Sequence, residues 1–157
     1  MFKINRKLEY ALIALKHMST KHPGQLTSAK EICAIYNTPF DPTSRVLQIM
    51  TQHEVLHAEQ GAKGGYVIVR DLNMFTLGEL SDMIIGPIEI ANCFHGNYST
   101  CEINHTCHII APMLNLNDYI KKLFDKMSVA ELIASKHHGA KSIKEKAVSK
   151  GSHEQDD

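Results

Sequence analysis

The chain has no tryptophan, only five phenylalanines and five tyrosines, and four cysteines among 157 residues. No run of 18 apolar residues is present, which excludes an ordinary transmembrane helix. The opening MFKINRKLEY lacks the apolar stretch of a signal peptide. We therefore expect a cytoplasmic protein with no membrane partner. In a reducing compartment, few cysteines indicate metal binding or redox chemistry instead of a disulfide framework.

An excess of one charge is also missing, because 17 Lys and Arg balance 17 Asp and Glu. The distribution is uneven: residues 1–75 carry a balance of +3 and residues 76–135 a balance of −4. The first half is therefore the better candidate for a polyanion partner. No Ser/His/Asp set, nucleotide-binding loop or carboxylate pair is recognisable, so we do not expect an enzyme.

Three helices are predicted in the first half of the chain. Apolar residues at helical spacing predict an amphipathic helix over residues 6–20. Ser28 followed by Glu31 predicts a capping box that opens a second, short helix. Asp41 before Pro42 predicts the N-cap and first residue of a third helix.

Two β-prone runs, residues 55–59 and 66–70, flank a glycine-rich tip and predict a hairpin. Helices followed by such a hairpin predict a winged helix-turn-helix over residues 1–75. The expected fold class is therefore mostly α (α+β), a winged helix-turn-helix with a long dimerisation helix.

Residues 76–134 are predicted to hold further helices. Capping boxes at Thr76 and Ser128 open two of them. An apolar stripe between the two boxes predicts a long helix: Ile110, Met113, Ile120, Leu123, Phe124 and Met127. Because no later segment pairs with that helix, packing against a second copy is expected, the alternative being packing on its own winged domain. The polar tail, residues 135–157, is predicted to be disordered.

Three cysteines gather in CFHGNYSTCEINHTC, with the spacing C-x7-C-x5-C. Zinc sites usually bring ligands in closer pairs, whereas Cys93, Cys101 and Cys107 are spaced widely enough to reach separate irons of an iron–sulfur cluster. Three thiolates leave one iron without a protein ligand. A fourth donor must then come from a histidine, a carboxylate, solvent or a second subunit, and the nearby histidines are His95, His105 and His108.

Several motifs together resemble the bacterial IscR/NsrR/RirA-type regulators, the Rrf-two family. The resemblance covers residues 1–134 and rests on LEYALIAL, GAKGGY, TLGEL, the cysteine loop and MSVAELI. It implies a homodimeric winged-helix transcription regulator whose iron–sulfur cluster alters binding to a palindromic operator. It also implies that Cys93, Cys101 and Cys107 are the cluster ligands, with 4Fe–4S preferred over 2Fe–2S.

The same resemblance bears on the fourth ligand. In the IscR branch a histidine follows the last cysteine by three residues, but Ile110 occupies that place here and His108 is out of register. In the NsrR-like branch a carboxylate of the first helix reaches the cluster of the other subunit. Glu9 stands at that position, so we prefer Glu9 of the partner chain as ligand.

The N-terminal part of the third helix is expected to enter the major groove. Candidates there and in the wing are Thr43, Ser44, Arg45, Gln48, Lys63 and Tyr66. Arg45 can pair with guanine and Gln48 with adenine. Relatives commonly carry basic residues at the end of this helix, where this chain has Thr51 and Gln52. We therefore expect weak DNA binding, or binding that requires the cluster.

Two alternatives remain open at this stage. A winged-helix regulator can sense through zinc, or through a disulfide between Cys101 and Cys107, without a cluster. A protein of another class, a cluster carrier or electron-transfer protein that has lost operator binding, would also fit the sparse basic residues. An iron–sulfur cluster is brown, whereas zinc and thiols are colourless, so the visible absorption of anaerobically purified protein distinguishes the cluster from the first alternative. Specific DNA binding excludes the second alternative.

Overall fold

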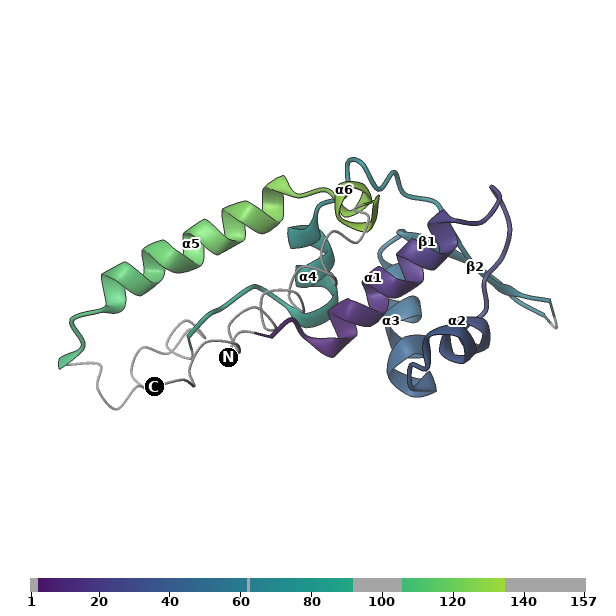
Figure 1. Cartoon of the computed structure of the whole chain (residues 1–157), viewed down its shortest axis with the longest axis horizontal. Coiled ribbons are helices and arrows are strands. Elements are labelled where there is room, and N and C mark those ends of the chain that lie inside the picture. The colour runs from purple at the N-terminus through teal and green to yellow at the C-terminus, as the bar shows by residue number, and fades with distance from the viewer. Residues whose placement is uncertain (1–2, 62, 92–105, 135–157) are drawn as a thin grey trace, which may run out of the picture.

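The computed structural model describes residues 3–61, 63–91 and 106–134. Within them the chain is mostly helical with one two-stranded antiparallel sheet (Figure 1). The elements are α1 Arg6–Ser19, α2 Ala29–Tyr36, α3 Phe40–Gln52, β1 Leu56–Glu59, β2 Gly65–Ile68, α4 Leu77–Ile85, α5 Ile110–Lys126 and α6 Val129–Ala134. The predicted mostly α winged helix is confirmed. Cys93, Cys101 and the tail predicted to be disordered lie outside the described residues.

One hydrophobic core joins the winged half to α4 and α6. Its largest fully buried side chains include Leu8, Leu15, Leu47, Phe75 and Leu80. In Figure 1, α4 lies between α5 and the winged half. No helix among the described residues is long and apolar enough to cross a membrane.

The capping box predicted at α2 is half right. Ser28 Oγ accepts from the Glu31 N–H at 3.1 Å, as expected. The Glu31 carboxylate, however, pairs with His17 Nε2 at 2.9 Å and Lys21 Nζ at 2.6 Å. Two cationic or polar partners from α1 and the turn after it outcompete a single local N–H. Glu31 therefore fastens α2 to the end of α1.

The predicted start of α3 is wrong. The helix begins at Phe40 after Pro39, and no side chain caps it. Pro39 has φ −67° and ψ 140°, an extended conformation that ends the turn and leaves the next residue to begin the helix. Pro42 is then the third helical residue, still in the first turn, where a missing N–H breaks no helical hydrogen bond.

The wing needs its glycines. β1 and β2 pair antiparallel, and Thr27 adds a bridge through two 2.9 Å hydrogen bonds with Tyr66. A Cβ on Gly65 would lie 2.8 Å from the Thr27 carbonyl oxygen, and one on Gly64 would collide with the Glu59 backbone. Only glycine lets these backbones approach so closely.

The other two capping boxes are confirmed. Thr76 accepts from Glu79 N, while the Glu79 carboxylate accepts from Thr76 N at 2.9 Å. Ser128 and Glu131 make the same reciprocal pair at the start of α6. Backbone hydrogen bonds from Leu77 N to Met127 O and from Val129 N to Phe75 O, both 2.8 Å, then join these two helix starts.

The long helix α5 buries no residue within this chain. Pro112 lies in its first turn, where it is tolerated. Of the predicted stripe, Met113, Ile120 and Phe124 are half-buried, whereas Leu123 is 57% exposed. Large apolar side chains at spacings of three and four are exposed along α5: Leu116, Tyr119 and Leu123.

Candidate nucleic-acid interface and metal centre

The α2–α3 unit presents one face of α3 to solvent. Asn37, in the left-handed conformation with φ 52°, makes the turn between the helices. Val46, Leu47 and Met50 face the core, while Arg45 and Gln48 are exposed and lie three residues apart on the opposite face. Both predicted base-contacting side chains are thus accessible together.

Thr43 has to be removed from the predicted interface. It is 0% exposed, and its Oγ1 donates to Thr38 Oγ1 at 3.0 Å. Its spacing of three and four from Val46 and Leu47 places it on the buried face of α3, a signal already present in the sequence. Ser44, beside it, is half-exposed.

In the wing, Lys63 is exposed, whereas Tyr66 is half-buried against the core. Tyr66 therefore helps to hold β2 against the core, whereas the Lys63 side chain is accessible to a partner. Two further side chains are exposed near this surface, His53 at the end of α3 and His57 on β1. Successive side chains of a strand point to opposite faces, so an apolar, buried Leu56 indicates that its neighbour His57 faces solvent.

Arg70 connects the wing to α4. Its guanidinium pairs with Glu79 and lies 4.3 Å from the centre of the Phe75 ring. Burial raises the pKa of Glu79, but hydrogen bonds from the Thr76 N–H and from Arg70 outweigh it and leave that pKa below its ordinary value. The capping box of α4 is thus also the attachment point of the wing.

Glu79→Gln is expected to be more destabilising at neutral pH than in acid. Because the folded pKa of Glu79 is depressed, its carboxylate stabilises the fold above the unfolded pKa, and this contribution is lost as the pH falls through the folded value. Urea unfolding of both proteins at pH 7 and pH 3 measures it. An equal difference in unfolding free energy at the two pH values would contradict the expectation.

Of the predicted thiolates, the structure describes Cys107. It is a half-buried free thiol that lies just before α5. The remaining free thiol among the described residues, Cys33, is half-buried in α2, where its Sγ accepts from Thr38 Oγ1 at 3.6 Å. Across residues 3–61, 63–91 and 106–134, no three His, Cys, Asp or Glu side chains gather as a metal site.

Glu9, the predicted fourth ligand, is half-exposed on the first turns of α1 and pairs with Arg6 at 2.8 Å. In Figure 1 the first residues of α5 form the end of α5 that lies farther from α1. Within one chain, therefore, Glu9 and the segment of Cys107 are not brought together. Cysteine sulfur is a soft ligand, so the half-buried side chain of Cys107 is of a type that suits iron or zinc.

Comparisons with solved structures agree with the winged-helix fold. The HTH-type transcriptional regulator NsrR of Bacillus subtilis is 24% identical over 147 residues, which cover 92% of this chain and 99% of the relative. The structure of CymR (YrzC), the global cysteine regulator of B. subtilis, has a TM-score of 0.66 at 21% identity and covers 87% of this chain and 100% of its own. T. potens IscR has a TM-score of 0.59 at 15% identity, over 88% and 94%.

A family model, Rrf2, described as an iron-dependent transcriptional regulator, matches residues 4–135. That description is of a regulator and not of an enzyme, in agreement with the sequence. The chain belongs to the Rrf2 family of transcription regulators.

Proposed function

We propose that the chain acts as a homodimer that reads a palindromic operator and senses iron, nitric oxide or redox state through an iron–sulfur cluster. Residues 1–75 form its DNA-binding part and residues 76–134 its cluster-binding and dimerisation part. The observation that carries the proposal is the exposed pair Arg45 and Gln48 on α3 of a winged helix. A two-fold dimer would place two such helices about 34 Å apart, one turn of DNA.

The dimer is supported by α5. Leu116, Tyr119 and Leu123 expose apolar surface on one side of a helix that has no fully buried residue in its own chain, although Phe124 packs against the core. Such an unpaired stripe is typical of a helix that packs against a second copy. The ligand set proposed below requires a dimer, because Glu9 and the segment of Cys107 are not brought together within one chain.

In that assembly Cys93, Cys101 and Cys107 would hold the cluster, with Glu9 of the partner subunit as a fourth ligand. A bound cluster would supply an iron centre sensitive to oxidants and to small ligands. The protein would transmit a change at the cluster to the DNA-binding part through two connections. A hydrogen bond from Leu77 N to Met127 O joins the end of α5 to α4, and the ion pair of Arg70 with Glu79 joins α4 to the wing.

Glu9→Gln tests the ligand set. We expect an altered visible spectrum and faster cluster decay in air, because the amide is a weaker ligand than the carboxylate. Arg6→Ala is the matched control, since it removes the ion pair on Glu9 but keeps the carboxylate. Identical spectra and decay rates in Glu9→Gln and the wild type would remove Glu9 from the ligand set.

A cluster-free thiol sensor is the second candidate. Among the similar structures is an oxidized form of Staphylococcus aureus CymR, with a TM-score of 0.65 at 16% identity over 87% of this chain and 100% of its own. Cys101 and Cys107 would then form the regulatory disulfide. A colourless protein after anaerobic reconstitution would favour this candidate or zinc over the cluster.

A further inference from the structure

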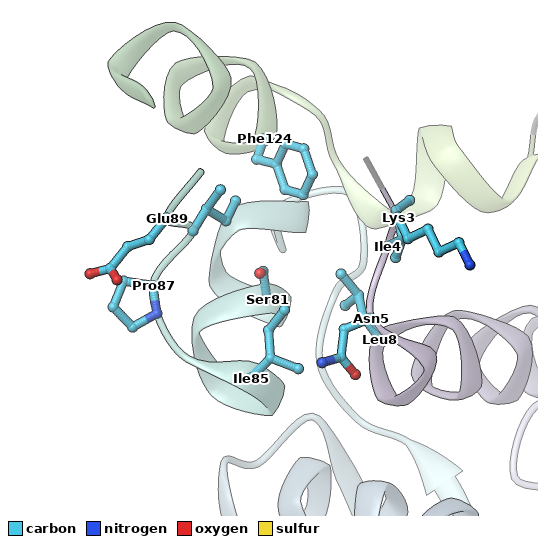
Figure 2. Close-up of a pocket in the computed structure, with 10 residues that line it drawn as sticks. Lys3, Ile4, Asn5, Leu8, Ser81, Ile85, Pro87, Glu89 and Phe124 are labelled. Atoms are coloured by element: carbon cyan, nitrogen blue, oxygen red, sulfur yellow. The ribbon is translucent and has the colours of Figure 1, made fainter. Parts of the chain in front are cut away.

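A cavity of about 170 Å³ lies between the start of α1, the face of α4, the segment after α4 and the end of α5 (Figure 2). Its wall is largely apolar: Ile4, Leu8, Ile85, Ile88 and Phe124. Among the described residues that line it there is no cysteine. The Ile90 N–H donates to Asn117 Oδ1 at 3.1 Å, and this hydrogen bond holds the segment after α4 against α5.

One polar group faces this cavity without a partner. Ser81, on α4, is 1% exposed, and its Oγ has no hydrogen-bond partner among the described residues. A serine inside a helix can satisfy its hydroxyl by bonding to the carbonyl four residues earlier, but Ser81 does not make this bond. Figure 2 shows its oxygen directed from α4 toward Phe124. A buried hydroxyl left unpaired is costly, so a ligand that pairs with it gains affinity.

We propose that this cavity binds a small uncharged molecule with an apolar body and one hydrogen-bonding group, which pairs with the Ser81 hydroxyl. The volume sets the size, since an apolar cavity of about 150 Å³ accommodates benzene. Figure 2 shows the charged ends of Lys3 and Glu89 pointing away from the centre of the cavity. An ion would therefore lose its hydration without gaining a counter-charge.

Titration of the cluster-free full-length protein with phenol tests this site. Benzene, which lacks the hydroxyl group, serves as the comparison probe. We expect saturable phenol binding with a dissociation constant on the order of 1 mM. The shifts should be confined to the methyl NMR signals of Leu8, Ile85 and Ile88. This readout involves neither DNA nor iron, so it stands or fails independently of the proposed function.

Two variants separate the hydroxyl from the cavity. Ser81→Ala is expected to weaken phenol binding about 3- to 10-fold and to leave benzene binding unchanged, with the exposed Ser19→Ala as control. Ile88→Phe, in the segment after α4, is expected to abolish binding of both probes by filling the space, with the exposed Val69→Phe as control.

The proposal is overturned if neither probe binds saturably, as would follow if a second copy fills the cavity in the dimer. It is equally overturned if Ile88→Phe leaves both affinities unchanged. Equal phenol affinity in Ser81→Ala and the wild type would exclude Ser81 as the recognition group.

Discussion

Cys107→Ser is expected to abolish stable cluster assembly, so that iron and acid-labile sulfide per chain fall to background after anaerobic reconstitution. The thiolate is a soft ligand suited to cluster iron, whereas a serine hydroxyl is hard and protonated at neutral pH. The position also matters, because Cys107 lies three residues before Ile110, the first residue of α5. A ligand lost there would uncouple the cluster from the helix that we expect to dimerise.

Cys33→Ser is the matched control for this substitution. Cys33 is also a half-buried free thiol, but it lies in α2 and contacts Thr38. We expect the Cys33→Ser protein to keep the wild-type iron and sulfide content. If Cys107→Ser retained that content as well, Cys107 would not be a cluster ligand.

Arg45→Ala is expected to weaken specific operator binding by about 1–3 kcal/mol, equivalent to roughly 5- to 150-fold, and to relax the preference for one base pair in each half-site. Arg45 is exposed on α3 beside Gln48, with no ion pair to it in the described structure. Its fork of donors can pair with both acceptors of guanine. Binding titrations at fixed salt, on an operator selected from random DNA, measure the loss.

Lys63→Ala distinguishes base reading from phosphate attraction. Lys63 is an exposed cation at the wing, and its loss should weaken binding to all sequences alike while reducing the salt slope by about 1. Arg45→Ala should instead reduce the difference between operator and random DNA. An unchanged base preference in Arg45→Ala would exclude α3 as the reading helix in this orientation.

Local chemistry in the sequence was sufficient for most of the fold. The reciprocal pairs Thr76 with Glu79 and Ser128 with Glu131 depend on neighbours three residues apart, so the pattern and the structure agree. Glu31 has the same local pattern but different distant partners. His17 lies 14 residues earlier, and that contact appears only when α1 and α2 pack together.

In the candidate interface, too, some features follow from the local sequence and others depend on packing between distant residues. Arg45 and Gln48 were predicted from the helix-turn-helix order and are exposed, whereas Thr43 was counted as a contact although its spacing matches the buried face. The close approach of Gly65 to Thr27 involves residues nearly forty positions apart and has no local signature. Cys93 and Cys101 lie outside the described residues, so their role stays a prediction.

The most direct test of the account is the anaerobic absorption spectrum of the reconstituted full chain, with iron and acid-labile sulfide quantified per chain. We expect a brown protein with a broad visible band and about four irons for each three-cysteine site. A protein that stays colourless and binds neither iron nor sulfide would contradict it, and would leave zinc or a thiol switch as the sensing chemistry.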